Sequence, residues 1–166
     1  MANHGYMSIT GKRQGLISAG CSGTHSIGNK CQIGHEDEIM VLAVSHNMLT
    51  EGDGSVSSDR GKHMPLMITK NIDKSSPLLA SALHEREEME CTLHFYRTSP
   101  AGGQDKYYKI QLRGAKIALI NVQVPHAIHM NDSQPQEIVS LRYRDISWTH
   151  IQAGTCAYST WGNEDE

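Results

Sequence analysis

The segment Glu137-Ile-Val-Ser-Leu-Arg-Tyr-Arg-Asp-Ile-Ser-Trp-Thr-His-Ile151 decides the fold of this 166-residue chain. Apolar and polar side chains alternate from Val139 to Arg144, which is the period of a β-strand with one covered face. Ile146 and Trp148 continue the apolar face, but with the alternation shifted by one residue. A β-bulge at Arg144–Asp145 would absorb this shift and bend the strand. A long, bent strand is typical of a closed or strongly curved sheet.

Further strands are predicted upstream as the pairing partners of this one. They lie in segments 6–10, 15–20, 38–48, 66–70, 89–97, 107–113 and 115–124. Segment 38–48 is apolar at consecutive positions, which indicates a strand covered on both faces. Segments 89–97 and 107–113 are expected to form a hairpin. Segment 115–124 contains a second shift of alternation, between Leu119 and Ile120.

One helix is predicted, beginning at Ser76-Pro77. Ser76 is placed to cap free backbone amides, and Pro77 suits the first helical position because an N–H there has no intrahelical partner. The apolar stripe between Leu79 and Leu83 then faces the core. Acidic residues at 87 and 88 would oppose the helix dipole, so the helix is expected to end near Glu85.

Two polar segments are predicted to be long loops. Residues 21–35 contain only isolated apolar side chains, and residues 50–61 cannot form a core and should project from the fold. Many strands, one helix and no internal repeat predict a mainly β fold: a small antiparallel β-barrel of two curved sheets with one short flanking α-helix. We expect residues 1–166 to form a single domain of this type, since the chain is long enough to bury its own core.

Composition and charge give no sign of a nucleic-acid partner, a membrane span or a secretory signal. The formal net charge of −3 gives no reason to expect nucleic acid. No apolar run approaches the ~20 residues of a membrane span, and the first residues lack the features of a secretory signal. We therefore expect the chain to fold in the cytoplasm, where its four cysteines stay reduced. Cys91 is interpreted as a small core residue, and a Cys21–Cys31 disulfide would be possible only after export.

The sequence contains no recognisable catalytic or cofactor site. Cys21, His25, Cys31 and His35 could bind zinc tetrahedrally, but their spacing matches no established zinc motif. The histidine pair at 126 and 129 is interpreted as a surface cluster. A nucleophile with its base, or a phosphate-binding glycine loop before a helix, cannot be recognised. We therefore expect no cofactor, no bound metal and no enzymatic activity.

Three segments together resemble the haemolysin-coregulated protein (Hcp) family of bacterial type VI secretion. They are Asp37–Met48, Ile68–Leu79 and Glu137–Thr149, and the resemblance extends over nearly the whole chain. The most specific part is Thr69-Lys70 leading through Ile72-Asp73-Lys74-Ser75-Ser76-Pro77. Strand, helix start and proline coincide there as they do in the family.

The resemblance implies a curved β-barrel with one flanking helix that assembles into a hexameric ring. Such rings stack into the inner tube of the secretion apparatus, inside a contractile sheath and behind a spike. The rings also carry small effectors in the lumen and protect them before delivery. The tube is exported through the type VI system without a cleaved signal peptide, and its role is structural rather than enzymatic.

The resemblance also assigns candidate contact residues. Ser45 matches a lumen-facing serine of the family that contacts cargo, with a serine packed within its strand as the alternative. The loop 51–63 resembles an extended family loop that reaches a neighbouring subunit or the next ring, with a merely flexible loop as the alternative. The expected contact residues in this loop are Gly52, Asp53, Gly54, Ser55, Asp59, Arg60 and Lys62.

Two other functions stay open on the sequence alone. One is a freestanding β-barrel module whose loops bind a small ligand or peptide. Such a module predicts a monomer, whereas the ring predicts a large, discrete oligomer. The other is a zinc-binding protein that uses the four Cys and His donors of the first loop, which predicts near-stoichiometric zinc in the purified protein.

Overall fold

The computed structural model describes residues 4–50 and 61–161. The strands within these ranges are β1 (Gly5–Gly11), β2 (Gly15–Leu16), β3 (Ile39–Ser45), β4 (Met48–Leu49), β5 (Lys62–His63), β6 (Leu66–Asn71), β7 (Met89–Thr98), β8 (Gln104–Gln123), β9 (Gln136–Arg142), β10 (Asp145–His150) and β11 (Thr155–Thr160). The helices are α1 (Thr24–Ile27), the 3₁₀ turn η1 (Gly28–Lys30) and α2 (Ser76–His84). The predicted mainly β fold with a helix after residue 75 is confirmed.

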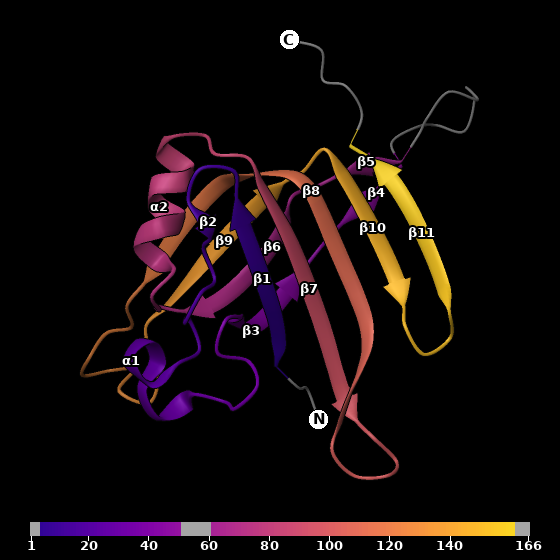
Figure 1. The fold of residues 1–166 in the computed structure, drawn as a ribbon. Coiled ribbons are helices and arrows are strands. Elements are labelled where there is room, and N and C mark those ends of the chain that lie inside the picture. The colour runs from indigo at the N-terminus through magenta and orange to yellow at the C-terminus, as the bar shows by residue number, and fades with distance from the viewer. Residues whose placement is uncertain (1–3, 51–60, 162–166) are drawn as a thin grey trace.

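Six of the described strands close into a barrel (Figure 1). β8 pairs with β7, antiparallel pairing continues through β1, β3 and β6 to β9, and β9 pairs with the other half of β8. β10 and β11 extend the sheet outward from β8 as a flange, with β11 at its edge. β4 and β5 form a separate two-stranded sheet. The small antiparallel barrel is therefore as predicted, and the flange is an addition to it.

The long strand β8 turns a corner at Gly114, so that it serves two walls of the fold. Its first half pairs with β7 and β10, and its second half, from Lys116 onward, pairs with β9. Gly114 has a φ of 60°, and a Cβ at this position would lie 3.0 Å from the Cβ of Arg144. Glycine adopts this conformation without a steric penalty, and no other residue would fit as well.

The segment 137–151 is two strands rather than the single bent strand predicted. β9 pairs with the second half of β8 and β10 with the first half. The predicted shift of alternation is present, because both Tyr143 and Ile146 are buried. However, the chain leaves the ladder at Tyr143–Arg144 instead of forming a bulge within one strand. The cause is tertiary: the partner strand turns at Gly114, and the segment paired with it must turn there too.

Three local predictions need correction. Residues 15–20 form only the two-residue strand β2, because the chain then folds into turns. The first predicted loop contains α1 and η1, whose short length left no periodic signal. The second shift of alternation lies between Ile117 and Leu119, one step before the predicted position.

Helix α2 spans the predicted residues, but its start differs in detail. Ser75 is the N-cap, and the predicted cap Ser76 is the first helical residue. The hydroxyl of Ser76 accepts a hydrogen bond from the Asp73 amide (3.0 Å) and donates one to Glu137 of β9 (2.7 Å). Through these two hydrogen bonds, Ser76 joins the start of the helix to the barrel wall, and it is not the helix cap. Leu79 is fully buried on the inner face, as predicted.

The barrel interior is a continuous apolar core that α2 closes on one side (Figure 1). Cys91 belongs to it, as predicted, with no solvent exposure. Other fully buried members are Met7, Ile9, Ile39, Leu66, Ile68, Leu79, Val139, Leu141 and Ile146. Because these residues come from nearly every barrel strand, burial of this core is the main stabilising contribution to the fold.

Candidate functional site

The family-like segment before α2 builds a buried ionic cluster. Lys70 of β6 is 0% exposed, and its Nζ lies 2.5 Å from Glu137 Oε1 and 3.0 Å from Asp73 Oδ1. The same ammonium donates hydrogen bonds to a backbone carbonyl (2.9 Å) and to the Ser76 hydroxyl (3.2 Å). A buried charge is tolerated only when it is paired and hydrogen-bonded in this way. The cluster therefore joins β6, β9 and α2, and its role is structural.

Ser45 is the last residue of β3, and its side chain is exposed. A register shift between Val41 and Ala43 reverses the alternation of β3, so Val41 faces the core while Ala43 and Ser45 face outward. Ser45 lies opposite the exposed Met67 of β6. The alternative of a serine packed inside its strand is therefore wrong. The position of Ser45 in a lumen stays a prediction.

Most of the predicted loop contacts lie outside the described residues. This applies to Gly52, Asp53, Gly54, Ser55, Asp59 and Arg60. Lys62 is described: it is an exposed residue of β5 and pairs with Leu49 of β4. The contact role of this loop therefore stays a prediction.

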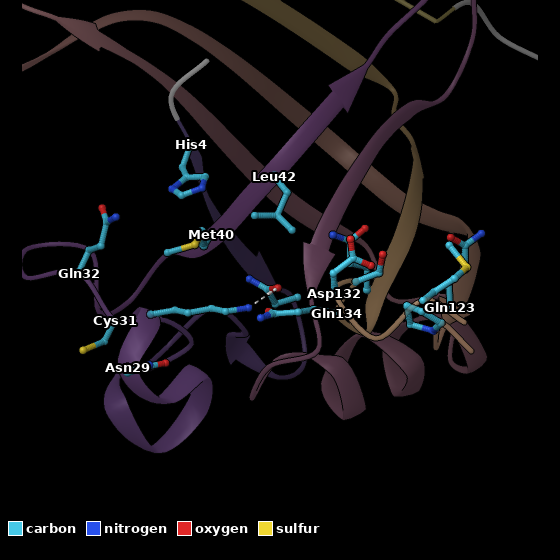
Figure 2. A pocket seen from close by; sticks show the side chains of 15 residues that line it. His4, Asn29, Cys31, Gln32, Met40, Leu42, Gln123, Asp132 and Gln134 are labelled. Carbon is cyan, nitrogen blue, oxygen red and sulfur yellow. Dashed lines mark hydrogen bonds between the residues drawn. The ribbon is translucent and has the colours of Figure 1, made fainter. Parts of the chain in front are cut away.

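A cavity of about 790 Å³ opens at the end of the barrel next to α1 (Figure 2). Its polar wall carries many carboxamides: Asn29, Gln32, Asn71, Gln123, Gln134 and Gln136. The Lys30 Nζ lies 3.4 Å from the Asn71 Oδ1, and the Asn71 amide nitrogen has no hydrogen-bond partner among the described residues. Met40 and Leu42 add apolar surface. A cavity of this size and lining suits a small polar ligand or a stretch of peptide.

A second cluster, beside β4 and β5 at the end of the barrel away from α1 (Figure 1), joins His46, His63 and Tyr143 through hydrogen bonds. Sequence reasoning missed both this cluster and the cavity. The residues of each come from segments far apart in the chain and belong to no local motif. Only the barrel topology brings them together.

The four residues of the zinc alternative do not form a metal site among the described residues. Cys21 is buried with its Sγ 3.6 Å from the Ile17 carbonyl oxygen, and burial raises the pKa of its thiol to about 11. The His35 ring instead stacks on Tyr6, with ring centroids 3.8 Å apart. Within residues 4–50 and 61–161, no three His, Cys, Asp or Glu side chains are arranged to hold a metal ion. The geometry therefore argues against the zinc alternative.

The histidine pair after β8 lies on the surface, as interpreted from the sequence. His126 and His129 are both exposed, with ring centroids 4.4 Å apart. The His126 Nδ1 accepts hydrogen bonds from the backbone amides of Ile128 (3.3 Å) and His129 (3.2 Å). Through these bonds the His126 ring stabilises the turn that follows it.

Comparison with known proteins identifies the family. The profile of the family described as "Type VI secretion system effector, Hcp" matches residues 6–150. This chain belongs to the Hcp family. The "Major exported protein" of Pseudomonas aeruginosa is 41% identical to it over 172 residues, which cover 97% of this chain and 96% of the relative.

Solved Hcp structures have the same fold as this Hcp-family chain. The structure described as "Crystal structure of Hcp protein" has a TM-score of 0.91 at 35% identity, covering 98% of this chain and 99% of the other. The "Secreted protein Hcp3 from Pseudomonas aeruginosa" has a TM-score of 0.83 at 39% identity, covering 98% and 100%. The resemblance inferred from three sequence segments is confirmed, and the chain is an Hcp-family protein of type VI secretion. No helix within the described ranges is long and apolar enough to cross a membrane.

Proposed function

We propose that this Hcp-family protein assembles into hexameric rings that stack into the exported inner tube of a type VI secretion system. The rings carry and protect small effectors in their lumen. Family membership and the 41% identity to a "Major exported protein" support this proposal. The partners are further copies of the chain, the sheath and spike proteins, and the effectors. The segment 52–62 is proposed to reach a neighbouring subunit or ring.

The observation that carries ring assembly is the number of exposed apolar side chains in the short segment 119–130. Five large apolar side chains there are exposed: Leu119, Val122, Val124, Ile128 and Met130. A neighbouring copy that covers such side chains would remove their apolar surface from water, which favours association. The β11 edge adds backbone groups that a neighbouring chain would pair or cover. A ring of identical copies provides such a partner for every subunit.

The first test of this proposal is the oligomeric state of the purified protein. Sedimentation velocity is expected to give one large, discrete species at micromolar concentration, and electron microscopy is expected to show annular particles. A single subunit that persists at high concentration would overturn the ring. That result would instead favour the second candidate function, binding of a small ligand or peptide, which the carboxamide-lined cavity beside α1 supports.

Cargo binding is tested by enlarging the side chain at Ser45. The exposed position at the end of β3 tolerates a larger residue without disturbing the core, so Ser45→Phe is expected to leave assembly intact. We propose that this face lines the lumen. The phenyl group of the variant would then obstruct the effector and lower its co-purification about tenfold, equivalent to roughly 1.4 kcal/mol of binding free energy. Ser81→Phe, at an exposed position of α2, is the matched control. Equal effector retention by both variants would count against a cargo role for Ser45.

A further inference from the structure

The β4–β5 hairpin continues from the barrel strands β3 and β6, and side-chain contacts rather than sheet pairing hold it against the other strands. Among the described strands, β4 and β5 pair with each other and stand apart from the main sheet. His46 precedes β4, and His63 lies in β5. Both imidazoles contact the hydroxyl of Tyr143, His46 through Nε2 at 2.7 Å and His63 through Nδ1 at 2.9 Å. Tyr143 directly follows β9, so one phenol group joins both ends of the hairpin to the barrel.

His63 lies at the centre of this cluster and is only 6% exposed. Its second ring nitrogen, Nε2, lies 2.9 Å from the Ser159 hydroxyl of β11. Its ring stacks with the indoles of Trp148 in β10 and of Trp161, at centroid distances of 6.4 and 5.9 Å. The hairpin is thus held against three segments of the barrel and flange.

The ionisable surroundings favour neutral imidazoles. Arg142 lies 5.3 Å from the Trp161 ring centroid, and Lys62 precedes His63 in β5. The Asp145 carboxylate of β10 is 3.1 Å from Arg144 Nε and is therefore already paired. Burial lowers the pKa of His63. Burial, followed by repulsion from His63, lowers the pKa of His46.

The cluster can bind one additional proton, but not two, without losing a hydrogen bond. The Tyr143 hydroxyl has one proton to donate and lone pairs that accept. With one imidazole protonated the network remains complete: that ring donates to the phenol oxygen, and the phenol donates to the other, neutral ring. With both protonated, both rings direct N–H groups at the same oxygen, the phenol proton loses its acceptor, and two like charges meet in a buried site.

We propose that His46 and His63 form a pH-sensitive latch, which holds the β4–β5 hairpin on the barrel and releases it once both rings are protonated. Proton linkage predicts that a lower pH favours the released hairpin. The released hairpin, with ordinary histidines of pKa about 6.5, binds more protons than the docked hairpin. The docked state is therefore fully favoured above that pH and loses stability as the pH falls toward the lowered pKa values. The latch concerns one subunit and does not depend on ring formation.

The test uses the chain's two tryptophans, which both lie against His63. Intrinsic fluorescence is recorded from pH 8 to pH 4.5, with far-UV circular dichroism measured in parallel to follow the barrel. The wild type is expected to show a red shift of tryptophan emission with a midpoint below about 6.5, while the circular dichroism signal stays constant. In His46→Gln only one imidazole remains in the network, so the red shift is expected to disappear or move to lower pH by at least about one unit.

The control variant is His84→Gln, which removes an exposed histidine of α2 and should titrate like the wild type. NMR titration of the wild-type imidazoles gives a second measurement: His46 and His63 should protonate in two steps separated by more than about one pH unit, as coupled groups do. The proposal is overturned if the wild type shows no emission shift, if His46→Gln titrates like the wild type, or if emission and circular dichroism change together as in global unfolding. Sedimentation at both ends of the pH range separates these results from ring dissociation.

Discussion

Replacing Lys70 with methionine is expected to lower the free energy of unfolding by about 3–5 kcal/mol. The methylene chain of the lysine is replaced by a side chain of similar length, so the change leaves little cavity. What disappears is the ammonium group, which lies within 3.0 Å of both Glu137 and Asp73. Their carboxylates then stay buried without a cation, and Ser76 cannot satisfy both. Urea unfolding at fixed protein concentration measures the loss.

Lys12→Met is the matched control for this prediction. Lys12 also pairs with a carboxylate, Glu88 at 2.8 Å, but its side chain is largely exposed. Exposed pairs contribute about 0–1 kcal/mol, so this variant should unfold close to the wild type. The double variant Lys70→Met/Glu137→Gln should recover part of the loss, because one buried charge is removed with its partner. If Lys70→Met behaved like Lys12→Met, the buried cluster would not be a stabilising centre.

The double variant Leu119→Asp/Val122→Asp is expected to abolish ring assembly and leave a folded single subunit. The two side chains are 51% and 55% exposed in the isolated chain. Aspartate at these positions should therefore change the folding stability of the single subunit little. In the proposed ring a neighbouring copy covers them, and each carboxylate would have to be buried without a cation. This costs several kcal/mol per ion. Sedimentation velocity measures the shift from the large species to the single subunit.

Ile33→Asp provides the control for assembly. Ile33 is 97% exposed and lies between η1 and β3, outside residues 119–130. The same change of charge there should leave the large species intact. Circular dichroism should show an unchanged β-sheet signal for both variants, which distinguishes loss of assembly from loss of folding. Normal rings from Leu119→Asp/Val122→Asp would place the subunit interface on another surface.

Local patterns predicted most of the barrel strands because each pattern reflects burial of one face. The alternation around Val139 and the shift before Ile146 both correspond to buried side chains. The pattern could not show that the shift separates two strands. That outcome depends on where the partner strand turns, and Gly114 lies some thirty residues earlier in the chain. Strand β11 was missed for a related reason: its residues are mostly exposed, so they show no apolar period.

The most specific family segment shows a different kind of limit. Thr69 to Pro77 supported the resemblance to Hcp proteins, and the comparisons confirm the family. The local pattern predicts a helix cap at Ser76 and an ordinary strand position at Lys70. The structure places both beside Glu137, a residue of the family-like segment Glu137–Thr149. Two separate family segments therefore meet in one buried ionic cluster.

By itself the sequence determined the β-rich fold, the helix after residue 75, the Cys91 core position and the family, because each depends on local periodicity or on a contiguous segment. Only the tertiary structure decided the Lys70 cluster, the outward position of Ser45, the carboxamide-lined cavity and the His46–Tyr143–His63 contacts. Those features depend on which strands become neighbours when the barrel closes. Closure brings together residues up to about a hundred positions apart, and no pattern within a short segment records such a distance.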